Sequence, residues 1–262
     1  MDNELINNDS DIETNDILDL ACYVGKLILE CGGETYRAED IVDKICTHYG
    51  LRVSCFAILT SVLASVRGKE NKFYTNIEKV KSRSINLEKI SKISNLVRAI
   101  ENYTFLEFSN EIKKIDTEKP YPFHSIILGN CLAAGAFAFF FNGDYKDCIA
   151  SFMSGAIISF LIYYSNKLQI NNFFINLSGG ILSSITSYFF LQTGLITDIS
   201  VSIISTLMLL VPGITFTNAI RDVIAGDLVS GISRGVEAFM VGTALAVGSG
   251  ITLSIIKTMG GL

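Results

Sequence analysis

The sequence predicts a mostly α-helical integral membrane protein, with an N-terminal cytosolic α+β head at residues 1–122 and a five-helix transmembrane bundle at residues 123–262. The first observation is charge: the head carries 16 Lys/Arg and 20 Asp/Glu, whereas the remaining residues carry 5 and 6. The second is that five apolar stretches with short polar connections fill most of the second part. Because a charged group inside hydrocarbon costs several kcal/mol, this step in charge marks a change of solvent.

Two helices are expected at the start of the head. Residues 17–30 and 36–49 have apolar residues at helical spacing, and Gly32-Gly33 and Gly50 follow them as helix terminators. The candidate N-caps of these two helices are Asp16 and Thr35.

The rest of the head changes character twice. Residues 51–80 are rich in β-branched and aromatic residues and contain the turn signal GKEN, which predicts two or three strands. Residues 86–101 return to helical spacing, and residues 105–115 predict a short helix leading to the membrane. Pro120 and Pro122 then mark the junction with the bundle.

Five membrane spans are expected in the bundle, several of them a little shorter than the roughly 20 residues that cross a bilayer. Lys113, Lys114 and Lys119 precede the first span, so the positive-inside rule places the head in the cytoplasm. Five crossings then place the C-terminus outside, in a multi-pass protein of the cytoplasmic membrane. The expected spans lie at about 125–141, 147–164, 173–191, 199–214 and 236–256.

Composition and motifs argue against several classes of protein. The net charge is −5 and no basic cluster is visible, which argues against a nucleic-acid partner. The six cysteines are scattered and His48 and His124 are isolated, so we expect reduced thiols and no metal site. The sequence contains no phosphate loop, GxSxG elbow or dinucleotide fingerprint. It therefore predicts neither an enzyme nor a bound cofactor.

The first candidate functional element is Val211-Pro212-Gly213 at the end of the fourth expected span. Proline removes a backbone donor and clashes with the preceding turn, and glycine lets the chain bend. The helix should therefore break here and free carbonyl groups at membrane depth. Broken helices of this kind line transport sites. Alternatively, Pro212 and Gly213 simply end the span.

The second candidate is the densest charged stretch of the bundle half, with five ionisable groups in seventeen residues where that half has eleven in all. An arginine at the membrane edge can hold a substrate carboxylate, and an Asp or Glu can carry a proton. Alternatively, these groups form ordinary surface ion pairs in a solvated loop. The candidate residues are Asn218, Arg221, Asp222, Asp227, Arg234 and Glu237.

The third candidate is a motif in the head. Helix capping explains Thr35, a tight turn explains the two glycines, and local pairs of Arg37 with Glu34 or Asp40 explain the charges. This structural account is sufficient from the residues alone. The head motif consists of Gly32, Gly33, Glu34, Thr35, Arg37, Glu39 and Asp40.

Two segments resemble the amino-terminal half of the threonine/serine exporter family: CGGETYRAEDIVDKIC at residues 31–46 and VPGITFTNAIRDVIAGDLVSGISRGVEAF at residues 211–239. The resemblance covers nearly the whole chain. It implies a secondary exporter of threonine and serine, or of dicarboxylates such as succinate in two-component members, driven by the proton gradient. It also places family motif positions at the candidate residues above and at Gly226.

The resemblance further implies a partner. Long members of the family carry a second, smaller bundle of spans, two-component members carry it as a separate polypeptide, and this sequence ends at Leu262 without it. We therefore expect a smaller multi-span membrane subunit of the same family, a small carboxylate substrate and the lipid bilayer as partners. The alternatives are a homo-oligomer of this chain, and a membrane-anchored ligand-sensing or scaffold protein without transport activity.

Overall fold

The computed structural model describes residues 13–68 and 72–259, so most of the expected GKEN turn lies outside the described residues. The chain packs as two units that are not consecutive in sequence. The head unit comprises the residues up to Lys119 together with Thr215–Gly235, and the bundle unit comprises Pro120–Ile214 and the residues from Val236 onward.

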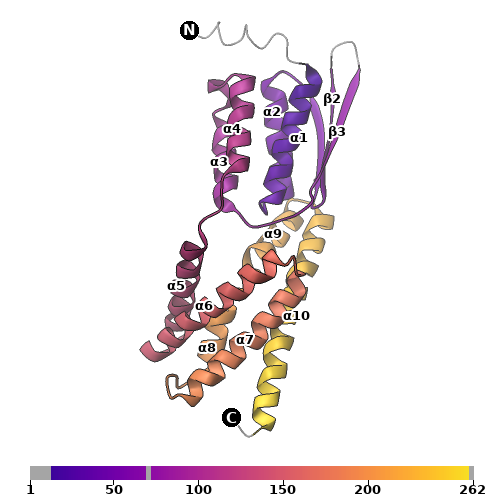
Figure 1. The fold of residues 1–262 in the computed structure, drawn as a ribbon. Helices are drawn as coiled ribbons and strands as arrows, with labels where there is room; N and C mark the ends of the chain where they lie inside the picture. The colour runs from indigo at the N-terminus through magenta and orange to yellow at the C-terminus, as the bar shows by residue number, and fades with distance from the viewer. Residues whose placement is uncertain (1–12, 69–71, 260–262) are drawn as a thin grey trace. The chain divides into compact units, whose positions relative to one another are not determined.

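The head unit packs helices and a three-stranded antiparallel sheet, counted over its described residues, around one apolar core (Figure 1). The strands follow the order β1-β2-β3. Helix α1 is buried along most of its length against α2 and the sheet, which makes it the centre of the core. The expected order of helices and strands is confirmed. The elements are α1 (Thr14–Glu30), α2 (Thr35–His48), β1 (Val53–Ile58), β2 (Ser61–Arg67), β3 (Phe73–Lys79), α3 (Leu87–Arg98), η3 (Ile100–Asn102) and α4 (Phe105–Thr117).

Both predicted N-caps are wrong. Helix α1 is preceded by Glu13, and Asp16 lies within its first turn rather than capping it. Glu34 precedes α2 without a side-chain cap, and Thr35 is the first helical residue. Gly50 ends α2 as expected, since its φ of 74° is a backbone conformation that glycine adopts without strain.

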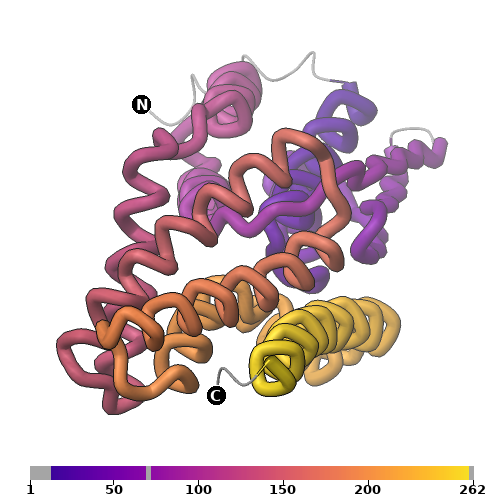
Figure 2. The backbone as a smooth tube through the Cα atoms, turned by 60° about the horizontal axis from the view of Figure 1, so that its bottom comes forward, coloured from indigo at the N-terminus to yellow at the C-terminus, as the bar shows by residue number. Residues whose placement is uncertain are grey.

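The bundle unit contains most of the apolar helices. Helix α5 packs against α6, α6 packs against α7, and α8 contacts all three (Figures 1 and 2). Helix α10 begins in the head unit and continues into the bundle unit from Val236. The helices are α5 (Phe123–Phe140), α6 (Tyr145–Lys167), α7 (Asn172–Gln192), α8 (Ile199–Leu207), α9 (Gly213–Ile224) and α10 (Leu228–Thr258).

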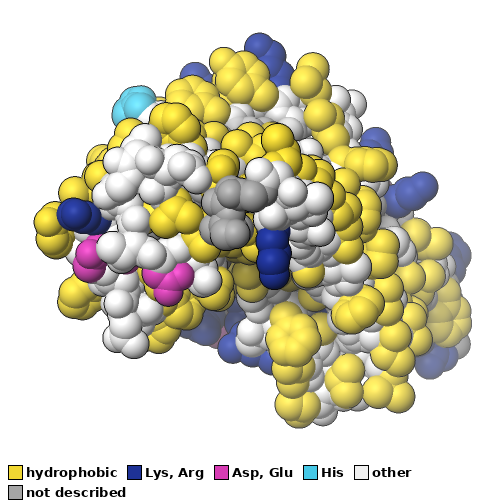
Figure 3. Space-filling model, turned by 90° about the horizontal axis from the view of Figure 1, so that it is seen from below, with side chains coloured by type: hydrophobic (Ala, Val, Ile, Leu, Met, Phe, Trp, Pro, Cys, Tyr) yellow, Lys and Arg dark blue, Asp and Glu magenta, His cyan; other side chains and the backbone are white. Residues whose placement is uncertain are grey.

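Four helices among the described residues are long and apolar enough to cross a membrane, namely α5, α6, α7 and α10. Their surfaces expose large hydrophobic side chains such as Phe139, Phe189 and Phe239, which would be costly in water. Figure 3 shows one face on which hydrophobic side chains dominate and charged ones are sparse. The chain is therefore a multi-pass membrane protein.

The fourth expected span, 199–214, is shorter than predicted. The helix α8 ends at Leu207 and has nine residues, roughly 14 Å at 1.5 Å per residue, against a hydrocarbon core of about 30 Å. Turn bonds follow, with the Leu210 amide donating to the Leu207 carbonyl at 2.8 Å. Pro212 accounts for this end, because a proline ring clashes with the carbonyl group four residues before it, which is that of Met208, and proline has no amide hydrogen to donate.

Glycines set the closest helix contacts of the bundle. A Cβ added at Gly248 on α10 would lie 2.3 Å from the Leu177 carbonyl oxygen of α7, and one at Gly180 on α7 would lie 2.5 Å from the Leu245 carbonyl oxygen of α10. Such small-residue contacts replace the hydrophobic driving force that helices lack in lipid.

Candidate functional site

The two sequence motifs, 187 residues apart, meet inside the head unit. The turn between α1 and α2 packs against α9 and the first turns of α10. We call this contact the motif junction. Its residues are Gly32, Gly33, Glu34 and Thr35 on one side, and Asn218, Arg221, Asp222 and Arg234 on the other.

The two glycines present their carbonyl groups to the facing helices. Gly32 has a φ of 82°, and its carbonyl oxygen accepts a hydrogen bond from the Asn218 amide at 2.9 Å. Gly33 has no room for a side chain, since a Cβ would lie 2.5 Å from Cγ2 of Ile28. Its carbonyl oxygen accepts from Nη2 of Arg234 at 2.5 Å. The two glycines thus offer backbone acceptors at positions that disfavour a side chain, Gly32 because of its positive φ and Gly33 because of its contact with Ile28.

Asp222 is the central acceptor of the motif junction and is fully buried. Its Oδ1 accepts hydrogen bonds from the Thr35 amide at 3.3 Å and the Thr35 hydroxyl at 3.2 Å. Its Oδ2 lies 2.8 Å from Nε of Arg234, and the exposed fractions of the two side chains are 0% and 4%. Burial raises the pKa of Asp222, and the Arg234 charge only partly offsets this.

Glu34 forms a second, outer ion pair. Its Oε1 lies 2.7 Å from Nη1 of Arg221 and its Oε2 lies 3.4 Å from Nε of Arg37. Burial opposes ionisation of Glu34, but hydrogen bonds from its own backbone and from Arg221, with the Arg37 charge, outweigh it and lower the pKa. Glu34 is therefore a stable carboxylate shared between two arginines.

A tight helix–turn–helix holds the α9 and α10 side chains in place. Gly226 ends α9 with a φ of 97°, and Oδ1 of Asp227 accepts from the Ser230 amide at 3.0 Å at the start of α10. Burial opposes ionisation of Asp227, but hydrogen bonds from Ser230 outweigh it and lower its pKa. A Cβ at Gly231 would lie 2.9 Å from the Ala219 carbonyl oxygen, so α9 and α10 pack closely enough to pair Asp222 with Arg234.

Helix α9 buries polar side chains and exposes apolar ones. Its polar residues Asn218 and Asp222 are buried against the head motif, while Phe216, Ile220 and Ile224 are exposed. A helix facing water shows the opposite arrangement. The outer face of α9 is therefore suited to an apolar environment such as a membrane interface.

The other predicted residues lie away from the motif junction or at its edge. Oε1 of Glu39 accepts from the Ala57 amide at 2.8 Å and ties α2 to β1. Asp40 forms an exposed pair with Lys44. The remaining three candidates, Pro212, Gly213 and Glu237, belong to the bundle unit.

Sequence analysis missed a set of buried hydroxyl groups inside the bundle unit. On α6 and α7 the Ser154 hydroxyl donates to Thr186 at 3.3 Å, and between α7 and α8 the Ser187 hydroxyl donates to Ser202 at 2.9 Å. The signal that could have found them is serine or threonine recurring at helical spacing on one face of each helix. The fully buried members are Ser151, Ser154, Ser183, Ser184, Ser187, Ser202, Ser205 and Thr206.

The fold and the site define a multi-pass membrane protein whose folded polar head contains a buried network of arginines and carboxylates. Comparison with known proteins makes this specific. The threonine/serine exporter (ThrE) family model matches residues 19–256, so the chain belongs to this family.

Relatives with assigned names fall into two groups. The threonine/serine exporter of Corynebacterium glutamicum is 27% identical over 250 residues, which are 91% of this chain and 51% of that protein. The probable succinate transporter subunit YjjP of Klebsiella aerogenes is 21% identical over 227 residues, covering 84% of this chain and 86% of that protein. The chain thus spans about half the length of the first relative. No solved structure matches it significantly.

Proposed function

We propose that this chain is a subunit of a secondary exporter for small carboxylate-bearing metabolites, threonine and serine or a dicarboxylate such as succinate, driven by the proton gradient. The names of the relatives support the substrate class. The observation that carries the mechanism is the buried Asp222–Arg234 pair, 2.8 Å apart, at the start of a helix that continues into the bundle.

Arg234 is the proposed substrate-binding group. Its guanidinium now holds the Asp222 carboxylate and the Gly33 carbonyl oxygen, so a substrate carboxylate competes with Asp222 for the same donor. Losing one arginine–carboxylate contact costs about 1.5–3 kcal/mol, or roughly 10–150-fold in affinity. Arg221 is a second candidate, but it is half exposed and paired with Glu34.

Asp222 is the proposed proton carrier. Its pKa is raised by burial, whereas that of Asp227 is lowered, which favours Asp222 over Asp227 in this role. In an exporter driven by inward proton flow, the proton and the substrate must cross in opposite directions and occupy the site in turn. Asp222 therefore takes up a proton on the outer side while Arg234 holds no substrate, and it releases that proton on the cytoplasmic side before Arg234 binds a substrate carboxylate for export. Glu237, on α10 within the bundle unit, is a further candidate carrier.

The proposed topology has the head in the cytoplasm and the C-terminus outside. Three lysines before α5 support a cytoplasmic head by the positive-inside rule. We assign the fourth crossing to α8 together with residues 208–214, interrupted at Pro212, since α8 alone is too short. Interrupted helices are the segments that line transport sites in other transporters. The buried hydroxyl groups of α6, α7 and α8 offer such a route polar partners.

A smaller multi-span membrane subunit is the proposed partner. The relative YjjP is named a subunit, which indicates an assembly of more than one chain. A homo-oligomer of this chain is the other assembly to be tested. A ligand-sensing or scaffold protein would need only the head and an anchor, and the polar bundle interior favours transport over that reading.

The function is tested by efflux of preloaded labelled threonine, serine and succinate from cells expressing this chain, with and without a neighbouring small membrane protein. Efflux only with both chains supports the two-component exporter and identifies the substrate. Efflux with this chain alone favours the homo-oligomer. Absence of efflux in both cases contradicts the proposal and favours the sensor.

A further inference from the structure

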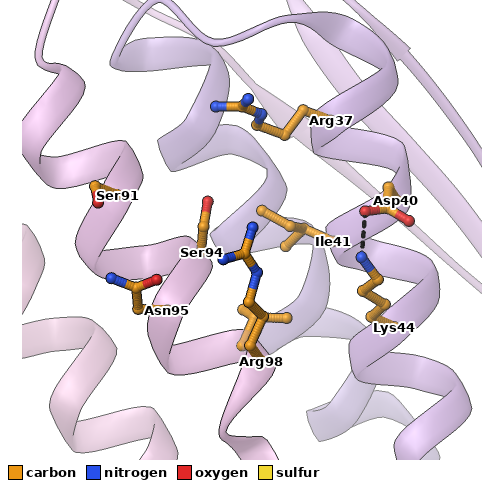
Figure 4. A pocket seen from close by; sticks show the side chains of 9 residues that line it. Arg37, Asp40, Ile41, Lys44, Ser91, Ser94, Asn95 and Arg98 are labelled. Atoms are coloured by element: carbon orange, nitrogen blue, oxygen red, sulfur yellow. Dashed lines mark hydrogen bonds and ion pairs between the residues drawn. The ribbon is translucent and has the colours of Figure 1, made fainter.

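The head unit contains a pocket of about 240 Å³ between α2 and α3 that the proposed export mechanism does not use (Figure 4). Helix α2 supplies Arg37, Asp40 and Lys44, and α3 supplies Ser94, Asn95 and Arg98 among others. Figure 4 shows Arg37 and Arg98 extending into the space between the helices. The pocket is thus lined by charged and polar side chains over an apolar floor at Ile41.

The charge of the pocket is unbalanced. Three cations face one carboxylate, and that carboxylate, Asp40, is paired with Lys44 at 2.6 Å. The Arg98 guanidinium has no ion pair or hydrogen bond with any other residue in the described part of the chain. Arg37 has one ionic contact, at 3.4 Å to Glu34. Two guanidinium groups from facing helices are therefore available to a ligand.

We propose that this pocket binds a small dianion, a short dicarboxylate or a phosphate, between Arg37 and Arg98, as a regulatory site distinct from the motif junction. Guanidinium groups bind carboxylate and phosphate through paired hydrogen bonds. The Ser94 hydroxyl and Asn95 amide add neutral donors to the same space. The volume is below the roughly 300–1,000 Å³ of drug-sized sites, which restricts the ligand to a few heavy atoms.

Glu34, a residue of the motif junction, links that junction to the pocket. Its Oε2 contacts Arg37 of the pocket and its Oε1 contacts Arg221 of the junction. An anion that draws Arg37 away leaves Glu34 to Arg221 alone, so occupancy of the pocket strengthens the outer ion pair of the junction. By linkage, weakening the Glu34–Arg221 pair lowers the affinity of the pocket for the anion. This coupling, unlike the binding site itself, rests on the proposed function of the junction.

Isothermal titration of the purified full chain with succinate, inorganic phosphate and, as a monoanion control, acetate tests the site. We expect saturable binding of at least one dianion, weaker binding of acetate, and at least a tenfold loss in Arg98→Ala. Arg98→Lys, which keeps the charge but not the paired donors, should lie between. Arg52→Ala, an exposed arginine outside the pocket, should bind as the wild type does.

Absence of saturable binding of either dianion, or equal affinity in Arg98→Ala and wild type, would overturn the site. Arg221→Ala should weaken the anion several-fold because Glu34 then turns to Arg37, and an unchanged affinity would overturn the coupling. These outcomes are separate from export. If Arg98→Ala loses anion binding but the chain exports none of the substrates, the pocket is supported and the proposed export function is contradicted. If the chain exports but Arg98→Ala binds the anion as the wild type does, only the pocket is contradicted.

Discussion

Removing the charge of Arg234 while leaving Asp222 in place is the most informative single perturbation. In Arg234→Gln the Asp222 carboxylate stays fully buried and keeps only its two hydrogen bonds from Thr35. Breaking a buried ion pair by removing one partner costs about 3–5 kcal/mol. Since the glutamine amide can still donate to Asp222 or to the Gly33 carbonyl, we expect the lower end, about 3 kcal/mol.

The loss is measured as a shift in the melting temperature of the purified full chain. For a domain of this size about 3 kcal/mol corresponds to roughly 6–12 °C. The chain has no tryptophan, but Cys22 and Cys46 are buried in the head, and burial raises the pKa of each thiol to about 12. A thiol-reactive dye therefore reports unfolding of the head as these thiols become exposed.

The matched control is Lys44→Gln, which removes a cation from an ion pair in which each side chain is 54% exposed. Exposed pairs contribute about 0–1 kcal/mol, so its melting temperature should fall by no more than about 4 °C. Adding Asp222→Asn to Arg234→Gln should recover much of the loss, because no buried charge then remains. Equal shifts for Arg234→Gln and Lys44→Gln, or no recovery in the double variant, would refute the reasoning.

Three further predictions follow from the same structure. The pKa of Glu34 is lowered in the folded protein, so the ionised side chain stabilises the fold at pH values above its ordinary pKa of 4.5. This stabilisation is lost as the pH falls through the lower folded pKa, so the melting temperatures of wild type and Glu34→Gln should converge in acid. Gly33→Ala places a Cβ against the backbone and a side chain of α1, and should destabilise the head by about 1–3 kcal/mol in the same thermal assay. Gly248→Ala should disrupt the contact of α10 with α7 and lower the melting temperature, whereas Gly242→Ala, with open space around its Cβ, should not; equal effects would contradict the contact.

The order of the elements could be predicted from the sequence because periodicity is a local property. The β-branched and aromatic residues of 51–80 predicted the strands, and helical spacing predicted α1 and α3. Caps were less predictable. Thr35 looks like a cap by its position, but its hydroxyl donates to Asp222, 187 residues away, and no local pattern contains that partner.

Several residues of the candidate site could be predicted from the sequence, but their pairing could not. Charge density drew attention to Arg221, Asp222 and Arg234, since ionisable groups are rare in the second half of the chain. Nothing local indicates that they pair with Glu34 and the glycine carbonyls of the head motif, because that pairing depends on the tertiary fold of the head unit. The buried serine and threonine hydroxyls carry no charge, so charge density does not indicate them.

Proton-dependent efflux in vesicles tests the central claim most directly. Vesicles containing the chain, with the small membrane partner if cellular efflux requires it, are loaded with the exported substrate and assayed with and without a proton gradient. The wild type and the control Lys114→Gln, an exposed head variant, should both be accelerated by the gradient. Asp222→Asn should lose that acceleration because it cannot exchange a proton. Full acceleration in Asp222→Asn would contradict the account.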